Sequence, residues 1–155
     1  MNRKRSPIGP EREQTMLKQL SIFAENKKGI MQEMTQILLE NDINILGHQT
    51  NESGEFGTVR MIVSDPAKAR EALAAAGYLC KLTNVIGAEL PDETGSLNAL
   101  LKVVSDCCVS MDHTYLSFNR KSGMPVLIIH TEDAGEVEQA IVRSGYKSVR
   151  ESEIR

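Results

Sequence analysis

The sequence predicts an α+β protein made of two βαββαβ repeats that share an antiparallel sheet. Apolar residues alternate or recur at helical spacing in the order strand, helix, strand, strand, helix, strand. The same order begins again after Leu90. No stretch rich in proline or serine separates the two halves, so we expect two rigidly coupled, ferredoxin-like units.

Composition restricts the class of protein. The chain has 155 residues, of which 41% are hydrophobic and 25% are charged, as in a packed globular protein. A net charge of -3 and the absence of tryptophan argue against nucleic acid as a partner. No apolar stretch approaches the roughly 18 residues of a membrane span, and no apolar signal segment follows the basic start. We therefore expect no membrane partner and a cytoplasmic location.

The first repeat follows a charged tail, residues 1–15, which lacks apolar periodicity and is expected to be flexible. Apolar residues alternate with less apolar ones over 20–24, which predicts the first strand. After a loop that ends at Gly29, apolar residues recur at helical spacing until Asn41. The repeat therefore starts with a strand, a loop and a helix.

A hairpin and a second helix complete this repeat. Residues 42–46 begin the second strand, turn-forming residues occupy 51–54, and the β-branched run 58–63 predicts the third strand. The pair Asp65–Pro66 predicts a helix start, because aspartate caps the free amides and proline suits the first turn. Gly77 predicts the end of that helix, and a long extended run follows it.

An internal repeat becomes visible when Gly29 is aligned with Gly95, because the spacing from each glycine to the next strand is then equal. The ending Gly77–Tyr78 recurs as Gly145–Tyr146. A unit of this size has a thin core alone, so the two units are expected to share a sheet or an interface. The expected repeats cover residues 16–84 and 85–155.

The loop before the first helix of each repeat is the candidate ligand site. Its glycine lets the backbone approach a ligand, and the helix start presents unpaired amide donors that suit a carboxylate or another anion. Simple helix capping by these loops stays open as an alternative. The predicted ligand-binding residues of the two loops are Asn26, Gly29, Ile30, Met31, Asp92, Gly95, Ser96 and Leu97.

Polar residues at the start of the second strand complete the candidate site. Asn44 and Ser110 occupy equivalent positions between apolar neighbours, and this strand start is expected to face the loop. Each side chain then either holds the α-amino or α-carboxylate group of a ligand or points outward as an ordinary strand residue. Asp92 either caps the second helix or holds a ligand ammonium group.

Catalysis, a metal site and a cofactor are not predicted. His48, His113 and His130 lie on separate expected strands, without a nucleophile and an acid at recognisable spacing. A ligand contact stays open for the first two. The three cysteines lack zinc-site spacing and are expected to be buried, reduced thiols, with Cys107 and Cys108 on opposite faces of a strand.

The order of these motifs resembles the ACT domain, present as a tandem pair over about residues 17–151. The match is strongest over 20–46, where Asn-x-x-Gly precedes a helix and Asp-Ile-Asn-Ile follows it. Family loops commonly carry proline before the glycine, where this chain has Lys28 and Thr94. The resemblance implies a continuous eight-stranded sheet of side-by-side units, with amino acids bound by the loop and strand residues named above.

The resemblance also implies a function. It predicts a regulatory module of metabolism, not an enzyme, whose ligand is a small molecule and most simply an amino acid. The alternative is a ligand-independent protein-interaction subunit that docks on a metabolic enzyme. Exposed sheet edges predict a homodimer in either case.

Overall fold

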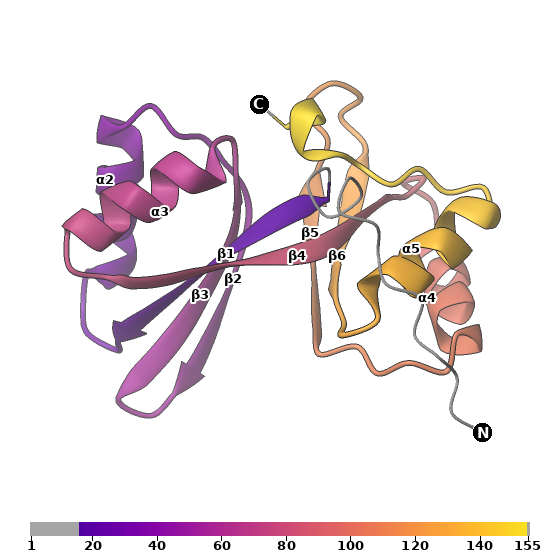
Figure 1. Cartoon of the computed structure of the whole chain (residues 1–155), viewed down its shortest axis with the longest axis horizontal. Coiled ribbons are helices and arrows are strands. Elements are labelled where there is room, and N and C mark those ends of the chain that lie inside the picture. The colour runs from indigo at the N-terminus through magenta and orange to yellow at the C-terminus, as the bar shows by residue number, and fades with distance from the viewer. Residues whose placement is uncertain (1–15, 155) are drawn as a thin grey trace.

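The computed structural model describes residues 16–154, so the expectation of a flexible tail over 1–15 falls outside the described part of the chain. Figure 1 shows the arrangement of the elements. In chain order they are β1 (Leu17–Glu25), α2 (Ile30–Glu40), β2 (Ile45–Ser53), β3 (Phe56–Val63), α3 (Pro66–Ala75), β4 (Leu79–Glu89), α4 (Ser96–Asp106), β5 (His113–Phe118), β6 (Pro125–His130), α5 (Ala134–Arg143) and η1 (Glu151–Glu153).

One six-stranded antiparallel sheet, in the order β2-β3-β1-β4-β6-β5, runs through both repeats. The long strand β4 joins them. Its pairing with β1 reaches Val85, opposite Leu17, and its pairing with β6 begins one residue later, where Ile86 lies opposite Ile129. The predicted shared sheet is confirmed, and the expected boundary after residue 84 falls inside a continuous strand.

The implied eight-stranded sheet is wrong for this chain. β4 serves as the last strand of the first repeat and as the first strand of the second, so one strand does the work of two. The segment after α5 does not form a full strand within the described residues. It pairs with β4 through the single bridge between Ala88 and Ser148. The sharing of β4 and the lack of a full strand after α5 among the described residues reduce the sheet from eight strands to six.

The sheet bends along β4, so its two halves face each other. Helices α2 and α3 cover the outer face of one half, and α4 and α5 cover the outer face of the other (Figure 1). A third core lies between the inner faces and contains residues of both repeats. Its members are Leu17, Leu46, Ile62, Val85, Tyr115, Val126, Ile128, Val149 and Ile154. We call this contact region the seam.

Close approach of β2 and β5 closes the seam on one side. Ser117 Oγ donates a hydrogen bond to the carbonyl of Leu46 at 2.9 Å. A Cβ atom added at Gly47 would lie only 2.9 Å from Ser117 Cβ. The absence of a side chain at Gly47 is therefore a condition of this contact.

Backbone conformation repeats with the sequence. Gly29 and Gly95 precede α2 and α4 with φ angles of 85° and 92°, and after these helices Asp42 and Cys108 have φ angles of 55° and 56°. Cys107 caps the end of α4. The expectation of a strand at this cysteine pair is thus wrong, as is burial of Cys108, which is exposed.

The predicted start of the second helix is confirmed in atomic detail. Asp65 Oδ1 accepts a hydrogen bond from the Lys68 amide at 3.2 Å, and Pro66 occupies the first turn of α3. These contacts satisfy an amide that would otherwise have no partner at the helix start. Within residues 16–154, no helix is long and apolar enough to cross a membrane.

Candidate functional site

The loop between β1 and α2, which we call the first corner, presents free backbone donors. Gly29 adopts the left-handed conformation immediately before the helix. The Ile30 amide already donates to the carbonyl of Lys27 at 3.3 Å. The amides of Gly29 and Met31 have no hydrogen-bond partner among the described residues. Two of the three predicted backbone donors are therefore available at the positive end of the helix dipole.

Asn26 braces the first corner against the β2–β3 turn. Its backbone amide donates to the carbonyl of Glu55 at 2.7 Å, and its side-chain Nδ2 donates to the carbonyl of Gly54 at 3.2 Å. These bonds fix the loop relative to the hairpin. The structure thus gives Asn26 a positioning role, and a ligand contact by this residue stays a prediction.

A surface hollow of about 420 Å³ lies beside the first corner. Its lining contains the positive charge of Lys27 and the negative charges of Glu25 and Glu33. Large apolar side chains also line it, although they are 47% to 70% exposed. The lining consists of Phe23, Ala24, Glu25, Lys27, Ile30, Glu33, Phe56, Ala76, Gly77, Tyr78 and Leu79. Ile30 is the one predicted site residue in this lining.

A tyrosine and a glutamate connect two walls of the hollow. Tyr78 Oη donates to Glu33 Oε1 at 2.6 Å. Burial, the hydrogen bond and the charge of Glu33 together raise the pKa of Tyr78 to about 12. Tyr78 is therefore a hydrogen-bond donor at neutral pH. This pair is not predictable from the sequence alone, because the two residues lie 45 positions apart.

The second corner, between β4 and α4, has the same backbone pattern. The Ser96 amide donates to the carbonyl of Glu93 at 3.2 Å, whereas the amides of Gly95 and Leu97 have no partner within residues 16–154. The capping role predicted for Asp92 is wrong, because Gly95 is the N-cap of α4 and no described side chain caps this helix. An ammonium contact by this exposed carboxylate stays a prediction.

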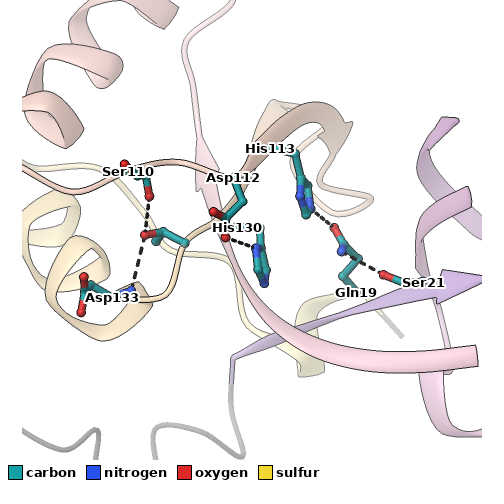
Figure 2. A network of polar contacts seen from close by, with 8 residues as sticks. Gln19, Ser21, Ser110, Asp112, His113, His130 and Asp133 are labelled. Carbon is teal, nitrogen blue, oxygen red and sulfur yellow. Dashed lines mark hydrogen bonds and ion pairs between the residues drawn. The ribbon is translucent and has the colours of Figure 1, made fainter. Parts of the chain in front are cut away.

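Asn44 and Ser110 do not face the corner of their own repeat. Each follows the end of an eleven-residue helix whose start forms that corner. A helix of this length separates the residue from its corner by roughly 16 Å. The backbone amide of Asn44 donates to Ser64 Oγ at 2.9 Å. The Ser110 carbonyl accepts from Thr131 Oγ1 at 2.9 Å (Figure 2). Their expected orientation toward the corner is therefore wrong within one repeat.

A buried polar network crosses the seam (Figure 2). Gln19 is 1% exposed, and its Oε1 accepts hydrogen bonds from Tyr115 Oη at 2.8 Å and from His113 Nε2 at 3.0 Å. The Gln19 Nε2 atom donates to Ser21 Oγ at 3.3 Å. The side-chain amide of Gln19 thus forms hydrogen bonds with groups from both repeats. It also fixes the tautomer of His113 that carries the proton on Nε2.

Two histidines stack at the second-repeat side of this network. The rings of His113 and His130 are nearly parallel, with centroids 4.8 Å apart. His130 Nδ1 donates to Asp112 Oδ2 at 2.8 Å. Burial, followed by the positive charges of Arg60 and His130, lowers the pKa of His113 to about 4. The ring is therefore neutral at physiological pH.

The sequence predicts that these histidines lie on separate strands, and it does not predict their contact. They are neighbours because β5 and β6 pair with His113 opposite His130. The spacing of 17 residues fits a hairpin, but the pairing depends on the length of its turn. Gln19 offered a weak signal, as an amide on a strand with apolar neighbours.

Comparisons with known proteins agree with this architecture. A family model described as an ACT domain pair matches residues 15–155. A crystal structure of a protein from Bacteroides thetaiotaomicron is 30% identical, with a TM-score of 0.82, and the match covers 91% of this chain and 97% of that chain. The search of curated proteins finds no match.

More distant structures share the fold. The ligand-free regulatory subunit of aspartate kinase from Thermus thermophilus is 17% identical, with a TM-score of 0.60, and covers 84% of this chain and 93% of that chain. The corresponding subunit from Thermus flavus has the same identity and coverage, with a TM-score of 0.54.

The tandem α+β architecture and its two glycine corners are those of the ACT class of domains. The family model spans nearly the whole chain. The chain belongs to the ACT domain pair family.

Proposed function

We propose that this protein is a regulatory module of metabolism that binds a free amino acid at the first corner. The observation that carries the proposal is the hollow beside two free helix amides, where Lys27 and two glutamates place both charges within one small space. An amino acid zwitterion carries the matching pair of charges. The family membership supports a regulatory use of such binding.

The lining suggests how the ligand lies. Its carboxylate meets the ammonium of Lys27 in the lining and extends toward the amides of Gly29 and Met31, which lie next to the lining and outside it. Its α-ammonium meets the carboxylate of Glu25 or Glu33. The exposed faces of Phe23, Phe56 and Leu79 then accept an apolar side chain, because covering them removes apolar surface from water.

A thermal-shift screen tests this proposal. Each common amino acid is added at about 10 mM, and a ligand of the native state raises the melting temperature. Isothermal titration then compares Lys27→Ala with Lys28→Ala. The second lysine lies in the same exposed loop but outside the hollow, so it controls for general charge. We expect at least tenfold weaker binding for the first variant and unchanged binding for the second.

Two outcomes contradict the proposal. One is the absence of any shift across the whole amino acid set. The other is equal binding by Lys27→Ala and by wild type. Co-purification of a metabolic enzyme together with a negative screen favours the alternative function, a ligand-independent interaction subunit.

The proposed oligomer is a homodimer. The edge strands β2 and β5 already contact each other across the seam, so a dimer needs another surface. Leu116 and Phe118 on β5 are 56% and 46% exposed. Light scattering of wild type and of Leu116→Glu measures whether a dimer forms and whether this strand contributes to it.

A further inference from the structure

The seam has an open, positively charged rim on its first-repeat side. Arg60 on β3 and Lys81 on β4 are both sheet partners of Ser21 on β1, so the three residues form one row across three strands. The row lies on the inner face, because Leu20 and Leu82, on the opposite face, pack toward α2 and α3. Neighbouring strands lie about 4.8 Å apart, so two long cationic side chains flank Ser21 at a spacing of roughly 10 Å.

The polar network described above connects this row to the second repeat. Ser21 Oγ accepts from Gln19, whose Oε1 accepts from His113. On the other side of Arg60 lies Gln49, its partner in β2, and Gln49 Nε2 donates to the carbonyl of Thr114 at 3.5 Å. Arg60 therefore lies beside a residue, Gln49, that contacts β5. After burial, the charge of Arg60 is the next cause that lowers the pKa of His113, and it opposes the rise that burial causes in the pKa of Tyr115, in agreement with this placement.

The rim lacks a counter-charge. Arg60 is half-buried and makes no ion pair with any residue of 16–154. Asp112 contacts His130 instead, at 2.8 Å. A half-buried guanidinium without a carboxylate is energetically unfavourable, because burial removes water that is not replaced by an opposite charge.

Unsatisfied polar atoms lie in the same place. Thr83 is the partner of Gln19 in β4, and Gln49 is the partner of Arg60 in β2. Among residues 16–154, the buried atoms Thr83 Oγ1 and Gln49 Oε1 have no hydrogen-bond partner. The Thr83 hydroxyl is able to donate to an acceptor, whereas Gln49 Oε1 is itself an acceptor and does not favour an anion. An anionic acceptor therefore suits the two cations and the Thr83 hydroxyl.

We propose that the rim of the seam is a binding site for a small oxyanion, held between Arg60 and Lys81 above Ser21, with the Thr83 hydroxyl as a further donor. The planar guanidinium suits a carboxylate or a phosphate equally, because it makes two parallel hydrogen bonds to either. This site is separate from the first corner. Because its residues come from β1, β3 and β4 while the polar network of Ser21 ends on β5, an anion here strengthens the contact between the repeats.

The test uses inorganic phosphate and malonate as probes on the whole chain. Each is compared in thermal shift with sodium chloride at equal ionic strength. A site with a millimolar Kd, filled about tenfold above that value, raises the melting temperature by roughly 3 °C. A shift with phosphate alone indicates a phosphorylated ligand, and a shift with malonate alone indicates a carboxylate. A shift with either probe supports the site.

Variants localise the effect. We expect Arg60→Gln and Lys81→Gln to lose at least half of the shift, whereas Arg70→Gln, on an exposed position of α3, keeps it. Lys81 is exposed, so its variant remains informative even when Arg60→Gln unfolds. Lys27→Ala also keeps the shift, which separates this site from the amino acid site. No shift beyond that of chloride, or a full shift in Lys81→Gln, overturns the proposal.

Discussion

Gly47→Ala tests the contact between the two halves of the sheet. The new methyl group would lie 2.9 Å from Ser117 Cβ, 3.0 Å from Ser117 Oγ and 3.2 Å from the carbonyl oxygen of Leu116. Carbon atoms in favourable contact are about 3.5–4.0 Å apart, so β2 and β5 must separate by several tenths of an ångström. The substitution therefore acts on the seam.

The cost follows from three terms. Overpacking of this kind costs about 1–3 kcal/mol. Separation of the strands also weakens the hydrogen bond from Ser117 to the Leu46 carbonyl, which contributes about 1 kcal/mol. Alanine is better than glycine in a strand by about 0.5–1 kcal/mol, which offsets part of the loss. We expect a net loss of about 1–3 kcal/mol in the free energy of unfolding.

Equilibrium unfolding in urea measures this loss, and a double variant identifies its origin. Ser117→Gly removes the two side-chain atoms nearest to the new methyl group. In a double-mutant cycle we expect a coupling energy of about 1 kcal/mol or more, because the clash disappears when both changes are present. Wild-type stability in Gly47→Ala, or strictly additive effects in the double variant, would refute the described contact between β2 and β5.

Three further predictions concern local features. Asp65→Ala removes the hydrogen bond to the Lys68 amide and should cost about 1 kcal/mol in urea unfolding. Cys108 has a left-handed backbone conformation, which is strained for a residue with a side chain. Cys108→Gly should therefore raise the free energy of unfolding by up to about 1 kcal/mol, and a loss of stability would contradict this reasoning. The pKa of His113 is about 4 in the folded chain and about 6.5 in the unfolded chain. Between these two pH values, His113 is therefore protonated in the unfolded chain and neutral in the folded chain. Stability should therefore fall as the pH is lowered from about 6.5 to about 4, and His113→Gln should show a smaller fall in the urea midpoint.

Local chemistry explains how much of the fold the sequence predicted. The Asp65–Pro66 helix start and the two glycine corners depend on residues within a few positions of each other, so they could be read directly. The equal spacing of the two halves predicted the repeat and the shared sheet. These features need no knowledge of distant partners.

Features that depend on tertiary pairing could not be read in this way. The bend of the sheet brings Gly47 into contact with a strand some 70 residues away. The stacking of His113 on His130 requires the register of β5 and β6. The orientation expected of Asn44 was wrong, because the polar residue is at the far end of the helix from the corner that it was assigned to.

The continuous strand β4 has a consequence for communication across the molecule. Its first residue, Leu79, lines the hollow at the first corner, and its last, Glu89, bonds to Asn119 in the β5–β6 turn at 3.0 Å. Eleven residues of extended chain span roughly 36 Å. Sliding of β4 along its axis would break its pairing with β1 and its pairing with β6 at the same time. We therefore expect β4 to move as one unit that connects the first corner to the β5–β6 turn. Cleaving the backbone at the midpoint of β4 would remove this connection while leaving every side chain in place.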